Sequence, residues 1–137
     1  MAEMVTMADV LAARRRIGPL VHRTALTPSL SLSEASGQTI LLKNEQQQLT
    51  GSFKLRGATN AVLSLSDEER GRGVTAASTG NHGRALSHAA KAAGTRAVIC
   101  MSSLVPANKV EAIRALGAEA RIVGRSQDDA QVEVDRL

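Results

Sequence analysis

The sequence predicts an α/β fold built on a doubly wound parallel sheet, and three observations support this. Short apolar segments typical of strands alternate with segments of helical periodicity between residues 74 and 137. Gly94 and Gly117 stand at two successive joins between a helix and the next strand. The strand segments are nearly continuous apolar runs, which is typical of a sheet that helices cover on both faces. We therefore expect three strands and their helices to form one small βαβ unit.

The length and composition fit one globular unit. The chain has 137 residues, of which 43% are hydrophobic and 22% charged, so it is not typical of a disordered tail. Its net charge is +4, but Arg14-Arg15-Arg16 is the only basic run and Phe53 the only aromatic residue, which disfavours nucleic-acid binding. His22 and His88 have no partner at metal-ligand spacing. With the single cysteine Cys100 and no apolar run of membrane length, we expect a cytoplasmic protein.

Helix and strand signals divide the first fifty residues. Apolar residues at three-to-four spacing predict helices, and a glycine or a Gly-Pro pair ends each of them. A Thr-Pro-Ser sequence is typical of a turn, and the apolar run that follows Gly37 is typical of a strand. The expected elements are helices at residues 7–17 and 30–35, a turn at residues 27–29 and a strand at residues 39–43.

A helix is expected from Phe53 to about Leu65, because Ser52 is a good N-cap residue. Its predicted inward face consists of Ala58, Ala61, Val62 and Leu65. The segment after it is expected to be a charged connection at residues 67–72. The further expected elements are strands at residues 74–77, 96–101 and 120–123, a turn at residues 78–83, and helices that end at Ala93, begin at Pro106 and run from Asp128 to Leu137.

Lys54 lies two residues after the predicted N-cap. A lysine is a poor nucleophile or base at its free pKa of about 10.4, so a reactive lysine needs a place that disfavours its charged form. The positive end of a helix and a buried setting both do this, and Phe53 and Leu55 flank Lys54. The alternative is a solvent-facing lysine on an amphipathic helix, which the local pattern alone favours.

The segment Ser-Thr-Gly-Asn-His-Gly at residues 78–83, here called the serine loop, places small residues where a strand becomes a helix. Glycines let the backbone approach a ligand, and a helix N-terminus favours a carboxylate or a phosphate. The alternative is an ordinary strand-to-helix turn with Ser78 or Thr79 as its cap. His82 has two interpretations, an acid or base and a residue that packs locally.

Together these segments resemble the fold-type II family of pyridoxal-phosphate enzymes, and most closely its serine/threonine dehydratase branch. The resemblance covers nearly all of the chain, and two motifs at family spacing are more specific than either alone. The matching residues are Thr27-Pro28, Lys43, Glu45, Gln48, Gly-Ser-Phe-Lys-Leu-Arg-Gly-Ala at residues 51–58 and the serine loop.

The resemblance implies that Lys54 forms the internal aldimine with pyridoxal 5′-phosphate and later moves the Cα proton. It implies that Phe53 packs near the pyridine ring and that Asn81 hydrogen-bonds the phenolic oxygen of the ring. The implied reaction is β-elimination from a hydroxy amino acid such as threonine or serine, which gives an oxo acid and ammonia. The residues implied to bind the substrate carboxylate are Ser78, Thr79, Gly80 and His82.

Three departures from related enzymes bear on the reaction. Leu55 replaces the aspartate usual in threonine synthases, and Asn81-His82-Gly83 differs from the sequence usual in cysteine synthases, so a dehydratase is favoured. Thr79 stands where dehydratases commonly have alanine and serine racemases have serine, so a racemase is the alternative. The motifs are also similar to those of dehydratases linked to hydroxyectoine breakdown, which adds a hydroxylated diamino acid to the expected substrates.

The resemblance implies a division of the chain in a fold like that of the tryptophan synthase β subunit. Residues 1–50 would be the N-terminal part of the large domain, and residues 51–137 a small βαβ domain. Family members are more than twice as long, and their later part contains the glycine-rich phosphate loop. We therefore expect an N-terminal portion that is weakly active alone and belongs to a homo-oligomeric enzyme, or else an inactive fragment or interaction module.

Overall fold

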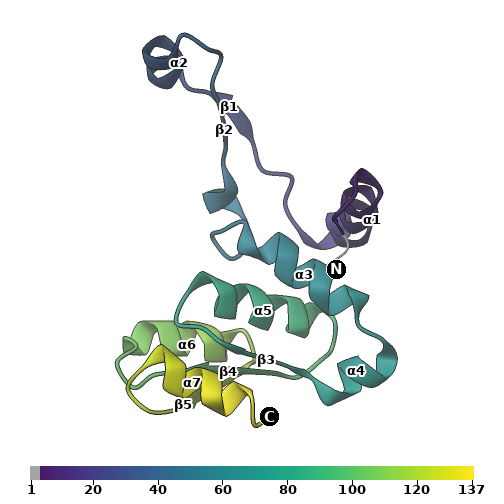
Figure 1. The fold of residues 1–137 in the computed structure, drawn as a ribbon, viewed down its shortest axis with the longest axis vertical. Helices are drawn as coiled ribbons and strands as arrows, with labels where there is room; N and C mark the ends of the chain where they lie inside the picture. Colours follow the sequence, from purple (N-terminus) through teal and green to yellow (C-terminus); the bar gives the residue numbers. More distant parts are fainter. Residues whose placement is uncertain (1–3) are drawn as a thin grey trace.

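The computed structural model describes residues 4–137, and strand β4 (Ala97–Met101), buried along its whole length, lies at its centre. β4 pairs in parallel with β3 (Val74–Ala77) on one side and with β5 (Glu119–Ile122) on the other. Ile99 of β4 is opposite Ala76 in β3 and opposite Ala120 in β5. The predicted α/β fold with a parallel sheet is therefore confirmed (Figure 1).

Alternate residues of β4 face two different layers of helices, as the pleat of a strand requires. Ile99 and its neighbours on the same side pack on helices α3, α5 and α6, and Cys100 packs against Ala130 of helix α7. The helices that cover the two faces are α3 (Lys54–Ser64), α5 (Asn81–Ala92) and α6 (Ala107–Ala115) on one, and α7 (Gln127–Val134) on the other.

The covering of both faces agrees with the predicted doubly wound arrangement. After β5 the chain crosses to the opposite face, where α7 contacts β4 and β3. The serine loop follows the carboxyl end of β3, and ligands of open α/β sheets bind at the carboxyl ends of the strands. The predicted elements of residues 74–137 are confirmed within two residues, with two exceptions. Helix α5 already begins at Asn81, inside the predicted turn at residues 78–83, and α7 ends at Val134 rather than Leu137.

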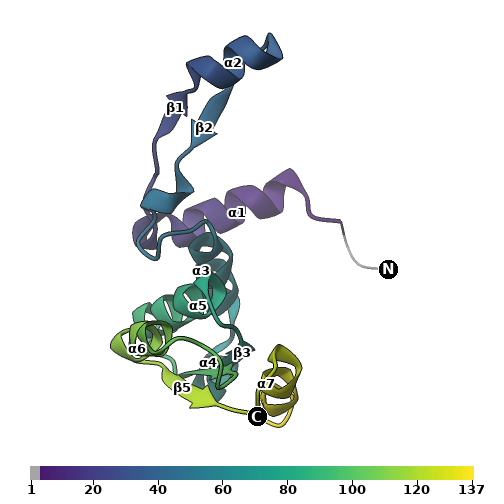
Figure 2. The ribbon, with the colours of Figure 1, turned by 90° about the vertical axis from the view of Figure 1, so that its left-hand side faces the viewer.

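Residues 22–44 form an arm that stands away from the parallel sheet (Figures 1 and 2). Strands β1 (Leu26–Pro28) and β2 (Leu41–Lys43) pair antiparallel, and helix α2 (Leu30–Ser36) joins them at the tip. The predicted turn at residues 27–29 is therefore wrong. Pro28 ends its strand, where a residue without an N–H group is tolerated, and the N–H of Ser29 continues the pairing to the carbonyl oxygen of Ile40.

Helix α1 (Met7–Ile17) is confirmed at its predicted bounds and packs on α3. Two short 3₁₀ helices, Gly18–Leu20 and Glu45–Gln47, lie at the base of the arm. No helix among residues 4–137 is both long enough and apolar enough to cross a lipid bilayer.

The predicted charged connection at residues 67–72 is wrong, because helix α4 (Asp67–Arg72) occupies it. The hydroxyl of Ser66 accepts a hydrogen bond from the N–H of Glu69 at 3.2 Å, and the Glu69 carboxylate accepts one from the N–H of Ser66 at 2.8 Å. This reciprocal capping box stabilises the start of α4, a helix that has no buried residue.

Candidate active site

The turn before α3 places Lys54 at the first residue of that helix. Gly51 adopts a left-handed φ of 77°, and its N–H donates to the carbonyl oxygen of Gln48 at 2.7 Å. The N-cap residue is Phe53, so the prediction of Ser52 as N-cap is wrong. The Ser52 side chain is buried, and its hydroxyl has no hydrogen-bond partner among the described residues.

The buried face of α3 differs from the predicted one. Ala58 and Val62 are buried as predicted, but Ala61 is exposed and Leu65 is only partly buried. Leu55 and Thr59 complete the buried face instead. Leu55 at the start of the helix is thus buried in the core, whereas its neighbour Lys54 is exposed.

Lys54 is exposed, which contradicts the predicted buried setting. Its amine makes no hydrogen bond or ion pair within residues 4–137. The neighbouring Phe53 side chain is 63% exposed. An unpaired amine and an aromatic ring therefore stand together at a helix N-terminus, where they are accessible to a planar ligand.

The Ser78 side chain forms hydrogen bonds within the serine loop. The Ser78 hydroxyl is buried and accepts a hydrogen bond from the N–H of Gly83 at 2.9 Å, with a longer one from Gly80 at 3.4 Å. Gly80 is the N-cap of α5 and has no side-chain cap. Ser78 thus caps the helix from two residues upstream, as the alternative interpretation of this loop predicts, and its role in substrate binding stays a prediction.

The remaining polar groups of the serine loop face outward. The side chains of Thr79, Asn81 and His82 are exposed, and a Cβ atom added to Gly80 would meet no atom within 4 Å. The N–H groups of Asn81 and His82 donate to no acceptor within residues 4–137. Free N–H groups at the start of a helix are suited to an anion such as a carboxylate.

Helices α3 and α5 pack along one another, and both begin on the left of Figure 1. A cavity of about 280 Å³ between them is lined by His82 together with Gly57, Ala58 and Ala61. Lys54 lies one turn before Gly57 and Ala58 on the same face of α3. The structure therefore places Lys54 and the serine loop at the same end of one helix pair, without a hydrogen bond between them among the described residues.

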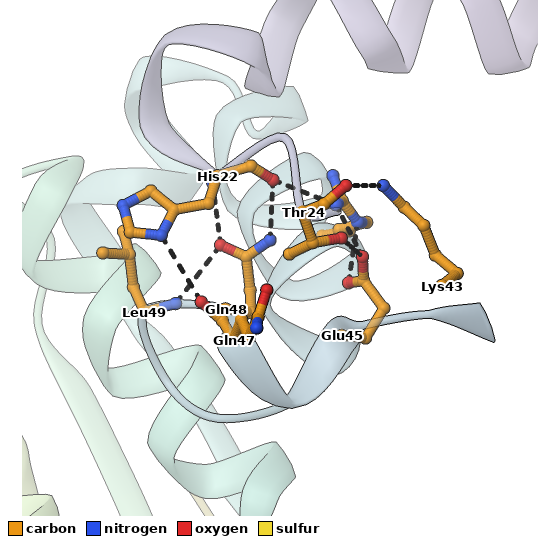
Figure 3. Close-up of polar contacts among 8 residues, drawn as sticks. His22, Thr24, Lys43, Glu45, Gln47, Gln48 and Leu49 are labelled. Atoms are coloured by element: carbon orange, nitrogen blue, oxygen red, sulfur yellow. Dashed lines mark hydrogen bonds and ion pairs between the residues drawn. The ribbon is translucent and has the colours of Figure 1, made fainter. Parts of the chain in front are cut away.

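A polar network that the prediction of site residues missed connects the start of the arm to Arg56 in the first turn of α3 (Figure 3). The Glu45 carboxylate accepts two hydrogen bonds from Arg56, at 2.7 and 2.9 Å, and one from Thr24 at 2.5 Å. The hydrogen bonds from Arg56, together with the one from Thr24 and the positive charge of Lys43, lower the pKa of Glu45 to about 2. The Glu45 network consists of His22, Thr24, Lys43, Glu45, Gln48 and Arg56.

The motif itself was the available signal for this network. Lys43, Glu45 and Gln48 match the family at fixed spacing before Lys54, although no chemical role followed from their residue types. A second cavity, of about 540 Å³, lies beside the network and is lined by Arg14, Arg23, Lys43 and Arg56 over an apolar floor. Neither Lys54 nor the serine loop lines it.

The sequence of residues 17–137 matches a family described as pyridoxal-phosphate dependent enzymes. A provisional threonine dehydratase of Sinorhizobium fredii is 65% identical over 133 residues, which are 97% of this chain and 40% of that protein. An L-threonine ammonia-lyase of Thermotoga maritima is 46% identical over 127 residues, which are 93% of this chain and 32% of that protein.

The crystal structure of a serine racemase from Dictyostelium discoideum superposes with a TM-score of 0.90 at 34% identity. The match covers 96% of this chain and 43% of that one. The chain therefore spans less than half the length of these three proteins.

Proposed function

The chain belongs to the family of pyridoxal-phosphate dependent enzymes, and we propose that it supplies the reactive amine and the substrate loop of a dehydratase. The proposed reaction removes the β-hydroxyl group of a hydroxy amino acid and releases an oxo acid and ammonia. The names of the two sequence relatives support threonine as the substrate. Serine and a hydroxylated diamino acid belong to the same proposed substrate class.

The common location of Lys54 and the serine loop is the observation that supports this proposal most strongly. Lys54 begins α3, the loop begins α5, and the two helices pack with their first turns at the same end. An amine and a set of free N–H groups thus face one region of the surface. A substrate bound there would have its carboxylate at the N-terminus of α5 and its Cα near the amine.

The residues present fit the proposed cofactor. Lys54 offers an exposed, unpaired amine for a carbonyl carbon, and the exposed ring of Phe53 offers an apolar surface to a pyridine ring. The buried hydroxyl of Ser52, one residue earlier, lacks a partner among the described residues and is free to bond a ligand. When bound, pyridoxal phosphate withdraws electrons from the Cα of the amino acid attached to it.

Each residue of the site has a proposed task. The Lys54 amine would hold the cofactor by its carbonyl group and would take the proton from the substrate Cα. Asn81 would donate a hydrogen bond to the ring oxygen of the cofactor. The substrate carboxylate is held by the hydroxyls of Ser78 and Thr79, the backbone of Gly80, and His82.

We also propose the division of the chain at residue 50. The β1–β2 ribbon stands away from the parallel sheet, and a two-stranded ribbon is marginally stable by itself. Further residues of the large domain would cover it, and a homo-oligomer would bury more of the apolar surface. The buried, unpaired Cys100 supports a reducing, cytoplasmic location.

The test is to incubate the full-length protein with pyridoxal phosphate, reduce it with borohydride and map the labelled peptide. Label on Lys54 is expected, and it should be absent from a Lys54→Ala variant. Lys43, Lys91 and Lys109 serve as internal controls, because the same reagent meets all four lysines of the chain. Label on one of these three instead of Lys54 would refute the assignment.

A racemase is the second candidate, because the exposed hydroxyl of Thr79 could serve as a second proton carrier and a serine racemase shares the fold. Chiral chromatography of a reaction with L-serine, together with an ammonia assay, separates the two activities. We expect ammonia to exceed D-serine. An excess of D-serine that the Thr79→Ala variant abolishes would instead establish the racemase.

A further inference from the structure

The side chain of Gln48 ties the turn before α3 to the start of the arm. It is 4% exposed, its Oε1 accepts from the N–H of His22 at 2.8 Å, and its Nε2 donates to the carbonyl oxygen of His22 at 2.9 Å. The amide therefore pairs with the backbone of His22 as a neighbouring strand would (Figure 3). Its Oε1 also accepts from the N–H of Leu49 at 3.3 Å, which leaves the turn little freedom.

The ion pair of Glu45 and Arg56 ties the first turn of α3 to the same place. Arg56 lies two residues after Lys54, and its guanidinium also donates to the carbonyl oxygen of His22 at 3.0 Å. A cation in the first turn of a helix is unfavourable, because the positive end of the helix dipole lies there. Glu45 compensates this charge and holds it by a bidentate contact that lysine could not make.

Lys54 has no comparable support of its own. Its amine is unpaired among the described residues, and α3 begins without a side-chain cap. The position of the amine consequently depends on the backbone of residues 48–56, which Gln48 and the ion pair hold at its two ends. The Thr24 hydroxyl also donates to the Glu45 carboxylate, and Nζ of Lys43 donates to the carbonyl oxygen of Thr24.

We propose that Glu45, Gln48 and Arg56 are positioning residues that hold the start of α3, and thereby the Lys54 amine, in the orientation that cofactor binding requires. This inference rests on the proposed role of Lys54. It assigns a task to three residues of the motif around the lysine, of which Gln48 is buried and Glu45 and Arg56 are partly buried. None of the three makes a hydrogen bond to the serine loop among residues 4–137.

The test uses Glu45→Gln and Gln48→Glu in the full-length protein, which change hydrogen bonding with almost no change of shape. Glu119→Gln is the matched control, since Glu119 is likewise a carboxylate in ion pairs with arginine, here Arg96 and Arg121. It lies on β5, away from the start of α3. Amide hydrogen exchange of residues 49–58 is measured without cofactor. Borohydride trapping of pyridoxal phosphate on Lys54 and the circular dichroism of the bound cofactor are measured next.

Glu45→Gln removes a charge-assisted contact, and Gln48→Glu removes the Nε2 donor to His22 and places a carboxylate at a buried position. Each change should raise the exchange rate of residues 49–58 about tenfold and lower cofactor affinity about as much. The circular dichroism per bound cofactor should also fall in Glu45→Gln and Gln48→Glu but not in Glu119→Gln. Only the first two variants free the start of α3, so only in them should the cofactor ring lose its fixed orientation. Unchanged exchange, or faster exchange with trapping and dichroism unchanged, would overturn the inference. Absence of trapping on Lys54 in the wild type would refute the proposed function separately, because exchange is measured without cofactor.

Discussion

Glu45 should make the stability of the protein sensitive to acid. Its pKa of about 2, against an ordinary 4.5, means that its contribution is complete above pH 4.5 and is lost as the pH falls toward 2. That contribution is at most about 3 kcal/mol, from the size of the shift. In urea unfolding at roughly pH 6 and pH 3, the Glu45→Gln variant should therefore lose less stability on acidification than the wild type.

The control for this prediction is Glu34→Gln, which changes an exposed carboxylate on α2 outside the Glu45 network. Its acid sensitivity should match that of the wild type. Equal acid sensitivity of Glu45→Gln and wild type would contradict the assignment of the low pKa to the contact with Arg56.

Gly83 and Gly80 should respond differently to alanine. A Cβ on Gly83 would lie 3.0 Å from Cγ2 of Ile99, 3.3 Å from Cδ1 of Ile113 and 3.3 Å from the carbonyl oxygen of Ser78. Overpacking of this kind costs about 1–3 kcal/mol, which should exceed the gain of about 1 kcal/mol in helix propensity. Urea unfolding of Gly83→Ala should therefore show a lower midpoint than that of the wild type.

Gly80→Ala is the matched control, because the added methyl group meets no atom within 4 Å. Its unfolding midpoint should stay near that of the wild type, while its KM for the amino acid should rise if the loop binds the carboxylate. A midpoint as low as that of Gly83→Ala would show that crowding by Ile99 and Ile113 is not the cause.

At the level of elements, helix α4 depends on its capping box. Ser66→Ala removes the side-chain acceptor for the N–H of Glu69, and such a loss costs about 1 kcal/mol. Ser64→Ala is the control, since the Ser64 hydroxyl donates back to the carbonyl oxygen of Asn60 and its removal should be nearly neutral. Amide exchange of residues 67–73 should quicken only in Ser66→Ala, and equal effects of the two changes would contradict the capping role.

The success of sequence-based prediction differed between elements for physical reasons. β4 was predictable because it is buried along its whole length, and α5 because it buries one continuous face, so each has a complete apolar pattern. α4 has no buried residue, and its one signal was the Ser66-x-x-Glu69 spacing. β1 was missed because its partner is β2, across α2, and the pairing of two exposed strands leaves no apolar alternation.

The candidate site shows the same limit. Lys54 and the serine loop were predictable from local chemistry and from their resemblance to a family. The exposure of Lys54 agrees with the alternative that the local pattern favoured, a solvent-facing lysine on an amphipathic helix, because Leu55 and not Lys54 lies on the buried face of α3. The Glu45 network joins residues more than twenty positions apart, as in the pairing of Gln48 with His22, and only the fold reveals such contacts.

For the whole molecule, the distribution of exposed apolar side chains separates the arm from the sheet. The β3-β4-β5 sheet has a helix layer on each face, whereas the arm and the start of α3 leave large apolar groups in contact with solvent. Exposed groups of this kind are typical of surfaces that another part of a protein covers. They are Leu26, Leu30, Leu32, Leu41, Leu42 and Phe53.

A polypeptide of residues 1–137 alone should therefore bind pyridoxal phosphate far more weakly than the full-length protein. Phe53 and Lys54 are exposed in it, and no two glycines are adjacent anywhere in its sequence to form a glycine-rich phosphate loop. Each missing charge-assisted hydrogen bond costs about 1.5–3 kcal/mol, so two of them lower the affinity by about a hundredfold or more. Equilibrium dialysis with a Lys54→Ala control measures this, and equal affinity of the two forms would mean that residues 1–137 already hold the complete cofactor site.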